Sequence, residues 1–334
     1  MLPAPKEFDA CGIGFVADAR GRASRDIITA AVGGLACVKH RGAVAADARS
    51  ADGTGLLTPI PRQLFGEGTG VAVLFLRGDE PRAEVEVAAK AEGIEVLEWR
   101  EPPIDPAALG ELARSSVPHI VQILFRPTDG TGSVADERSA YRFRRRIEQA
   151  APHAYVASCS YRTVVYKGLA PADAIADFYL DLADERFTGS FGIFHQRFST
   201  NTLPTWERAQ PFRNLCHNGE INGLWGNERR MAGRAELGTA AAGLGPEELF
   251  QPLFDPYDSD SGKLDAAVEF LTMGGRDVRH AMAMTIPEAW ENDRDMPADL
   301  HGFYRYHSAL MEPWDGPAGV VISPTGDVVS VTLD

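Results

Sequence analysis

Short apolar runs alternate along the chain with longer stretches of helical spacing. Runs rich in β-branched and aromatic residues, bounded by turn residues, predict strands at 11–17, 71–76, 94–99, 120–125, 155–160, 163–167, 189–197, 318–322 and 328–333. Apolar positions three and four apart predict helices at 25–38, after a Ser24 cap, and at 82–91, 107–114, 136–149, 172–183 and 263–273. This order does not require a doubly wound parallel sheet. The pattern therefore predicts an α/β or α+β fold with several antiparallel strand pairs.

The same pattern suggests how the elements combine. Residues 71–150 predict a compact α/β excursion, either a small subdomain or an insertion in a larger sheet. The strands at 155–160 and 163–167 are predicted to pair with each other, and the last two strands to form a hairpin around a turn at 324–326. Segments 41–55 and 199–227 are predicted to be mainly loops. Because the chain stops at the second hairpin strand, we expect a piece of a longer polypeptide or an excised domain.

Charge and composition narrow the possible functions. The 33 Lys and Arg residues against 47 Asp and Glu give a net charge of −14, which argues against nucleic acid as a partner because phosphate binding needs clustered cations. No apolar run approaches the ~18–20 residues of a membrane span, and the first ten residues lack the apolar core of a signal peptide. These features favour a cytoplasmic protein with no membrane partner.

Motifs for nucleotides and metals do not occur in the sequence. The four cysteines, Cys11, Cys37, Cys159 and Cys216, include no CxxC pair, so we expect reduced thiols and no zinc site. The sequence also contains no GxGxxG between a strand and a helix, no GxxxxGK[ST], no HExxH and no GxSxG. We therefore expect neither a metal ion nor a nucleotide cofactor on this chain.

Cys11 lies ten residues into the chain, after a polar, proline-containing leader. If the leader were removed, the new α-amino group of Cys11, with a reference pKa of about 7.7–8.0, could act as general base for its own thiol. The alternative is a small buried residue that opens a strand. Position alone leaves both interpretations open.

Two further segments offer groups suited to a zwitterionic ligand. Arg197 ends an apolar strand and is followed by Ser199, Thr200 and Asn201; its planar guanidinium could bind a carboxylate through two hydrogen bonds, or could form a surface ion pair. A carboxylate in the segment 258–261 could hold a ligand ammonium, whereas the alternative is a set of N-capping residues for the next helix.

A third segment contains the pair Asn218-Gly219. Between two strands such a pair is ordinarily a type I′ hairpin turn. Alternatively, the Asn218 amide and the next backbone N–H would form two convergent donors, as an oxyanion hole requires.

Taken together, these segments stand in the order found in one protein family. They are CGIGF from Cys11, KHRGA from Lys39, ADGTG from Ala51, HQRFSTN from His195, AQPF from Ala209, HNGEIN from His217, DSDS from Asp258, IPEAW from Ile286 and MEPWDGP from Met311. The chain resembles the class II glutamine amidotransferase domain at the N-terminus of glutamate synthase large subunits, a family of N-terminal nucleophile hydrolases. The resemblance runs from about residue 8 to the last residue.

The resemblance implies a four-layer αββα sandwich of two mostly antiparallel sheets, an α+β fold, formed by residues 11–334 after a processed leader of residues 1–10. It implies hydrolysis of the side-chain amide of L-glutamine, with the ammonia passed to a synthase portion or subunit. Cys11 matches the nucleophile, and Asn218 and Gly219 match the oxyanion hole. Arg197, with Thr200 beside it, matches the group that binds the substrate α-carboxylate, and Asp260 the group that holds the α-ammonium.

The same resemblance sets expectations for cofactors and for the other cysteines. Full-length family members use FMN and an iron–sulfur cluster in regions that this sequence lacks, so we expect no cofactor on this chain. Cys37, Cys159 and Cys216 are expected to be buried bystanders.

Two other functions remain open. A peptidase or acylase of the N-terminal nucleophile type could use the same scaffold, although Arg197 and Asp260 suit a free amino acid better. A truncated module that serves only in assembly would need no chemistry at Cys11.

Overall fold

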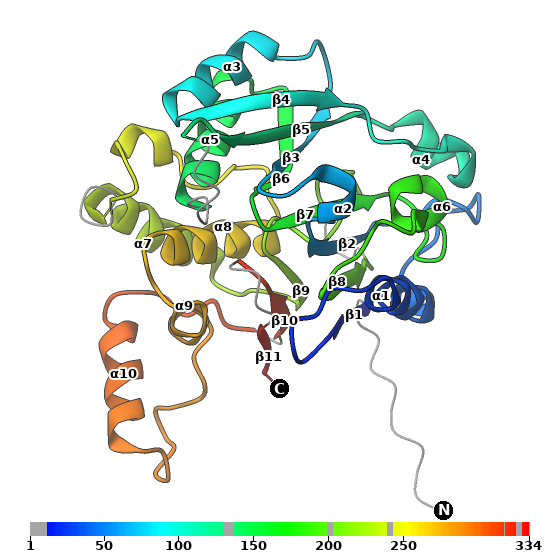
Figure 1. Ribbon diagram of the computed structural model, residues 1–334. Helices are drawn as coiled ribbons and strands as arrows, with labels where there is room; N and C mark the ends of the chain where they lie inside the picture. The colour runs from blue at the N-terminus through cyan, green and yellow to red at the C-terminus, as the bar shows by residue number, and fades with distance from the viewer. Residues whose placement is uncertain are drawn as a thin grey trace, which may run out of the picture.

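The computed structural model describes residues 12–129, 137–198, 203–238, 243–316, 318–324 and 329–333 (Figure 1). Its strands are β1 (Gly12–Ala17), β2 (Thr54–Pro59), β3 (Gly70–Leu76), β4 (Ile94–Arg100), β5 (His119–Pro127), β6 (Ala154–Ser160), β7 (Thr163–Gly168), β8 (Phe191–Gln196), β9 (Leu215–Gly219), β10 (Ala318–Ile322) and β11 (Val329–Leu333). The strand orders are β1-β8-β2-β7, β11-β10-β9 and β4-β5-β3-β6, and the pairings within these sheets are antiparallel.

Helices surround these sheets. The α-helices are α1 (Arg25–Cys37), α2 (Arg62–Phe65), α3 (Arg82–Ala91), α4 (Glu111–Ser115), α5 (Glu137–Ala150), α6 (Ile175–Phe178), α7 (Leu224–Gly238), α8 (Asp260–Met273), α9 (Val278–Thr285) and α10 (Ala298–Ser308). Short 3-10 helices are η1 (Lys39–Arg41), η2 (Pro106–Ala108), η3 (Leu180–Ala183) and η4 (Glu247–Phe250). In the part of the chain that the structure describes, no helix is long and apolar enough to cross a bilayer.

Two of the sheets pack face to face to form a sandwich. The layer between the β1-β8-β2-β7 sheet and the β11-β10-β9 sheet is filled by apolar side chains from both: Leu57, Val165, Phe191, Ile193, Cys216 and Val321. Helix α1 packs on the outer face of the first sheet, and α8 on the outer face of the second. The layers therefore run helix, sheet, sheet, helix, and the predicted αββα sandwich of α+β class is confirmed.

Local sequence explains why α1 covers its sheet. The Ser24 hydroxyl accepts the N–H of Ile27 at 3.4 Å and caps the helix, as predicted. Ile28, Ala31 and Leu35 are fully buried at helical spacing. Alternation along β8 completes the packing, because Ile193 points between the sheets while the next residue, Phe194, belongs to the core beneath α1.

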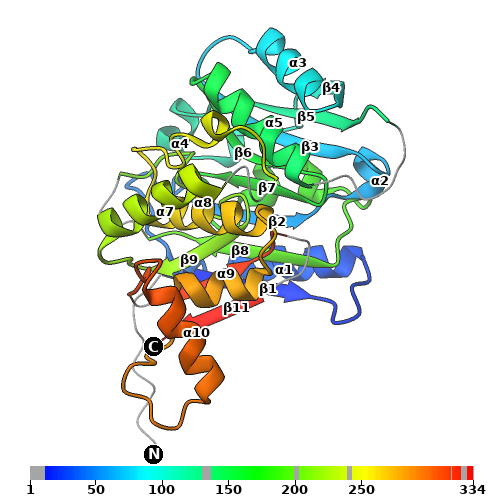
Figure 2. The same ribbon diagram turned by 90° about the vertical axis from the view of Figure 1, so that its left-hand side faces the viewer.

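The third sheet, β4-β5-β3-β6, lies beyond the sandwich at the top of Figures 1 and 2, with α3 and α5 on its outer face. Its strands and helices come from residues 70–160, which include the segment 71–150 predicted as an α/β excursion and, beyond it, β6. Its inner face joins the core beneath α6, where Val73 and Phe75 pack with Phe178 and Trp206. In the opposite direction, α10 projects downward in both views.

One predicted strand pairing is wrong. β6 and β7 do not pair with each other: β6 pairs with β3 in the third sheet, and β7 pairs with β2 in the sandwich. The Ser160 hydroxyl accepts the N–H groups of Arg162 and Thr163, at 2.8 and 3.0 Å, and holds a turn that carries the chain from one sheet to the other. Spacing along the sequence cannot reveal that two adjacent strands enter different sheets.

Other elements differ from the sequence-based expectation. β2 begins inside the segment predicted as loop, and β9 and the start of α7 lie in the second predicted loop. The helices predicted at 107–114 and 172–183 are each broken into short turns, η2 with α4 and α6 with η3. The hairpin β10–β11 is confirmed, but residues 325 and 326 of its predicted turn lie outside the described residues.

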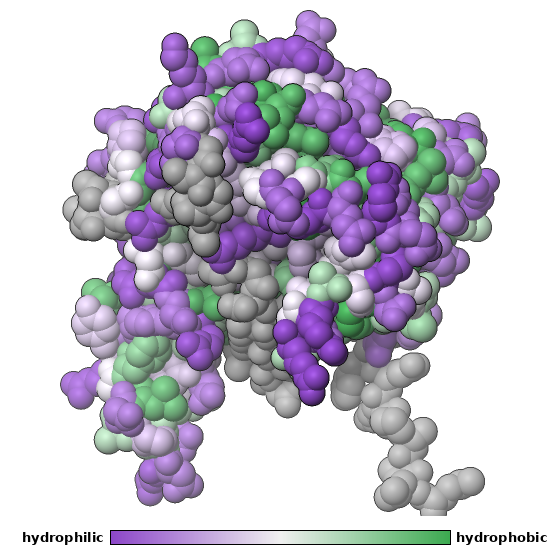
Figure 3. Space-filling model, in the orientation of Figure 1, coloured by the Kyte–Doolittle hydropathy of each residue, from purple (hydrophilic) through white to green (hydrophobic). Residues whose placement is uncertain are grey.

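The face shown in Figure 3 is mostly hydrophilic, with apolar residues in small separate patches. This surface agrees with a chain of net charge −14 whose apolar residues are largely used in the cores.

Candidate active site

The strand ends that carry the predicted chemistry gather at one end of the sandwich. Gly12, the residue after Cys11 in sequence, pairs with Gln196, the last residue of β8, and Arg197 follows directly. β9, which ends in Asn218 and Gly219, contacts both β1 and β8 across the sandwich. Cys11 and Thr200 themselves lie outside the described residues.

Arg197 is held against the start of β2. Its backbone N–H donates to the Gly53 carbonyl at 2.8 Å, and the Gln196 amide donates to the same oxygen at 3.3 Å. The residue is buried, with 7% of its surface exposed, so the alternative of an ordinary surface ion pair is wrong. A guanidinium buried this deeply is suited to a specific anionic partner rather than to water.

Asn218 and Gly219 end an edge strand and do not form a hairpin turn. Asn218 pairs with Gly319 of β10, which is distant in sequence, and the chain continues after Gly219 into a loop that leads to α7. Gly219 has φ +154°, a conformation that favours glycine. The type I′ hairpin alternative is therefore wrong, since consecutive strands do not flank the Asn-Gly pair.

The loop after Gly219 is held by the MEPWDG segment near the C-terminal end. The Asn222 N–H donates to the Asp315 carbonyl at 2.9 Å, and the backbone of Gly316 lies directly against Glu220. A Cβ atom on Gly316 would come within 1.8 Å of the Glu220 carbonyl oxygen, and Gly316 has φ +145°. Only glycine fits there, so this segment fixes the backbone beside the proposed oxyanion donors.

Asp260 links the start of α8 to the same loop. Ser259 is the N-cap of α8, as the alternative interpretation of the 258–261 segment predicts, and its hydroxyl accepts the Gly262 N–H at 3.2 Å. The Asp260 carboxylate accepts the Ser261 N–H at 2.7 Å and the Ile221 N–H at 3.2 Å. Asp260 is thus brought to the loop that follows Asn218 and Gly219.

His217 contacts side chains from two other segments of this region. The sequence patterns predicted no role for this residue. Its ring Nδ1 lies 2.8 Å from the Ser261 hydroxyl oxygen, and its backbone exchanges two hydrogen bonds with the Gln210 side chain. Burial lowers the pKa of His217, and the nearby Asp260 opposes that shift. The positions of these residues in the sequence could have indicated a role. Gln210, His217 and Ser261 lie in the segments AQPF, HNGEIN and DSDS, which carry the family resemblance.

His195 of β8, two residues before Arg197, adds a second buried imidazole. The side chain is fully buried. Burial, with Arg197 and His217 as further causes, lowers the pKa of His195 to about 3. The ring is therefore neutral near neutral pH and adds no positive charge beside Arg197.

The described cysteines are free thiols, as predicted, but their expected burial is only partly correct. Cys216 is buried and burial raises the pKa of its thiol, whereas Cys159 is half-buried and Cys37 is exposed. Cys37 follows Leu35 by two positions in α1, about 200° around the helix, and so faces away from the sheet.

A cavity of about 830 Å³ lies beside this end of α8, between α5, β6 and the segments 205–213 and 252–258. Its walls include Arg144, Glu148, Arg213 and Asp258, and its rim includes the Arg77–Glu207 ion pair. Arg197, Asn218, Gly219 and Asp260 do not line it. The cavity is therefore separate from the predicted substrate groups.

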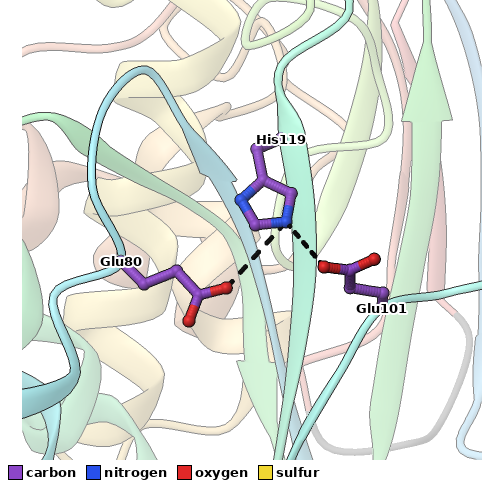
Figure 4. A group of neighbouring side chains, drawn as sticks. All are labelled: Glu80, Glu101 and His119. Atoms are coloured by element: carbon purple, nitrogen blue, oxygen red, sulfur yellow. Dashed lines mark hydrogen bonds and ion pairs between the residues drawn. The ribbon is translucent and has the colours of Figure 1, made fainter.

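One group of side chains has the composition of a cation site. The ligand atoms of Glu80, Glu101 and His119 lie within 4.8 Å of one another, at the end of the third sheet where β5 begins (Figure 4). His119 Nε2 is 3.2 Å from Glu101, and Glu80 also pairs with Arg82 at 2.6 Å. These contacts account for the grouping. Glu80 is half-buried, Glu101 and His119 are exposed, and the group lies beside β4 and β5 rather than beside β8, the strand that leads to Arg197.

Comparison with known proteins identifies the family. The model of the glutamine amidotransferases class-II family matches residues 11–334, nearly the whole chain. The chain belongs to the class II glutamine amidotransferases. The match begins at Cys11, the residue that the sequence singles out as a candidate nucleophile.

Individual relatives of this amidotransferase are glutamate synthases. The chain is 40% identical to ferredoxin-dependent glutamate synthase 2 of Synechocystis sp. and 38% identical to the chloroplastic ferredoxin-dependent glutamate synthase of Oryza sativa subsp. japonica, each over 98% of this chain. It is 37% identical to the glutamate synthase [NADPH] large chain of Bacillus subtilis, also over 98% of this chain. The chain spans only 22–23% of the length of these relatives.

Proposed function

We propose that this amidotransferase hydrolyses the side-chain amide of L-glutamine to L-glutamate and ammonia, with Cys11 as nucleophile. The observation that carries the proposal is the family match that begins at Cys11, combined with the structure around Gly12. The residue after Cys11 pairs with Gln196, beside Arg197, and its strand contacts β9, which ends in Asn218 and Gly219.

In the proposed reaction, residues 1–10 are removed and the free α-amine of Cys11 takes the thiol proton, directly or through a water molecule. The sulfur attacks the δ-carbon of glutamine, and the oxyanion accepts hydrogen bonds from the Asn218 amide and the Gly219 N–H. The amine returns the proton to the leaving ammonia, and water then hydrolyses the γ-glutamyl thioester. Arg197 and Thr200 bind the substrate α-carboxylate, and Asp260 its α-ammonium.

The proposal extends to the role of the reaction. The relatives are glutamate synthases more than four times as long as this chain, so we propose that the ammonia is used by a synthase portion or subunit. We assign the FMN and iron–sulfur chemistry of that synthase to regions outside these 334 residues, and no cofactor to this chain. We also propose a cytoplasmic location, in keeping with the free thiols of the three described cysteines.

Labelling and mass spectrometry test this proposal. A glutamine-analogue alkylator is expected to add one equivalent to the wild-type protein, and none to a Cys11→Ala variant, which also loses glutamine hydrolysis. Cys37→Ser is the matched control, because Cys37 is an exposed thiol and its substitution should leave labelling and activity unchanged. The intact mass should correspond to a chain that begins at Cys11.

Other outcomes would favour the rival functions. Labelling that persists in Cys11→Ala removes Cys11 from the role of nucleophile. Hydrolysis of N-blocked peptides without hydrolysis of glutamine would favour the peptidase or acylase. An intact mass that retains residues 1–10, with no hydrolysis, would favour a module that serves only in assembly.

A further inference from the structure

The outer edge of β9 has no neighbouring strand among the described residues, since β9 is the last strand in the order β11-β10-β9. The backbone groups of Leu215 and His217 on that edge nevertheless have partners. The Asp265 carboxylate accepts the N–H groups of Asn214 and Leu215, at 2.8 and 3.1 Å, and the Phe212 N–H donates to the Leu215 carbonyl at 2.8 Å. Side chains and a loop therefore replace the missing strand.

The last hydrogen-bonded position on this edge is His217, and Gln210 fills it. The Gln210 Oε1 accepts the His217 N–H at 2.8 Å, and the Gln210 Nε2 donates to the His217 carbonyl at 3.1 Å. One primary amide thus reproduces both hydrogen bonds of an antiparallel rung. Gln210 is 5% exposed, so water does not compete effectively for either bond.

The position of Gln210 is itself fixed by β2. A Cβ on Gly55 would come within 2.7 Å of the Gln210 carbonyl oxygen, and a Cβ on Gly53 within 2.9 Å of Ala209. Gly53 also accepts the backbone N–H of Arg197. The 209–210 segment therefore lies between the strand end that carries Arg197 and the strand end that carries Asn218.

We propose that Gln210 is a positioning residue for the oxyanion hole. Its amide fixes the backbone of His217, one residue before Asn218. Because Gln210 also packs against the segment that binds the backbone of Arg197, it links the positions of the two segments. The distance between the two ends of a bound glutamine, the α-carboxylate at Arg197 and the reacting carbonyl at Asn218, is then set by one buried side chain. This inference rests on the proposed glutaminase function.

The effect of removing the amide should appear mainly in kcat. Gln210→Met keeps the length of the side chain and deletes both polar atoms, so the His217 N–H and carbonyl lose their partners. Asn218 would then be free to shift, and a shift of about 1 Å in a catalytic group costs up to roughly 100-fold in rate. We expect kcat for glutamine to fall about 10- to 100-fold, while KM stays within about threefold because Arg197 and Asp260 are retained.

A pH profile separates positioning from packing. In a Gln210→Glu variant, the protonated carboxyl can donate to the His217 carbonyl and accept from its N–H, whereas the ionised carboxylate can only accept. The ratio of variant to wild-type kcat should therefore rise as the pH falls through the range where the introduced carboxyl binds a proton. If the Gln210→Met variant does not fold, the Gln210→Glu variant alone can test the inference.

Gln122→Met is the matched control. Gln122 is 1% exposed, donates to the Tyr166 hydroxyl at 3.2 Å, and lies in the third sheet away from the site. We expect this variant to lower the melting temperature without lowering kcat per folded molecule. Three outcomes would each overturn the inference. The Gln210→Met variant could keep the wild-type kcat, or the fall in kcat could only follow the folded fraction in both variants. The ratio of variant to wild-type kcat for Gln210→Glu could also stay constant with pH. A wild-type protein without glutaminase activity would instead overturn the proposed function on which the inference rests.

Discussion

Two buried polar regions adjoin α8, and they are built differently. At the active-site end, His195, His217 and Gln210 are neutral side chains, and those of His217 and Gln210 pair with the backbone or with a hydroxyl group. Towards the third sheet, five charged side chains pair with one another: Arg144, Glu148, Arg213, Asp265 and Glu269. The first region uses neutral polar groups, whereas in the second each of the five charged side chains has a partner of opposite sign.

The ionic region has a clear structural role. Arg144 on α5 pairs with Glu148 at 2.6 Å and with Glu269 on α8, and Arg213 pairs with Asp265 of α8 at 3.1 Å. Asp265 in turn accepts two N–H groups at the start of β9. These charges tie the third sheet, α8 and β9 together. The comparison shows that charged side chains are buried here where each has an opposite partner, because a buried charge without one is costly, whereas the polar side chains at the ends of β8 and β9 are neutral.

The largest expected effect comes from breaking the ionic region. Arg213→Leu leaves Asp265 and Glu269 buried without one of their cationic partners, and we expect a loss of about 3–5 kcal/mol in the free energy of unfolding. Chemical denaturation measures this loss. Arg279→Ala, at an exposed ion pair with Asp277, is the control and should cause no measurable change. Equal stability losses in the two variants would contradict the distinction.

The next expected effect tests the proposed catalytic role of Asn218. Asn218→Ala removes one proposed oxyanion donor while the fold is retained, so kcat for glutamine should fall about 100- to 1,000-fold, or ~2.7–4 kcal/mol in barrier height. Steady-state kinetics measures this fall, together with the melting temperature. Asn218→Asp keeps the shape but cannot donate, and should lose at least as much activity. A variant with normal kcat and reduced stability would assign Asn218 to packing only.

The third effect is the smallest for a single step of one pH unit, and it concerns the buried, neutral imidazole of His195. His195 has a pKa of about 3 in the folded state against a usual value of about 6.5, so between these pH values the unfolded chain binds more protons. The free energy of unfolding should therefore fall as the pH drops through this window, by up to about 1.4 kcal/mol per pH unit from this group. Denaturation at several pH values should show a shallower slope for His195→Gln. The same substitution at exposed His119 controls for the loss of a surface imidazole.

Many of the confirmed features follow from patterns of neighbouring residues along the chain. Regular spacing predicted α1, α3, α5 and α8 and most strands, because amphipathic periodicity depends on neighbours along the chain. Short motifs in a fixed order predicted the family and the αββα sandwich. The same motifs named Arg197, Asn218, Gly219 and Asp260, whose roles stay predictions together with those of Cys11 and Thr200.

The contacts between elements that are distant in the sequence depend on the tertiary structure. It placed β6 and β7 in different sheets, started β2 inside a glycine-rich segment predicted as loop, and brought Gln210 and Ser261 to His217. The physical reason is that a buried polar group takes its partner from whatever element lies against it in space. Neither the hydrophobic period nor the residue type specifies that neighbour. The contacts that hold the backbone of His217 are therefore visible only in the folded structure.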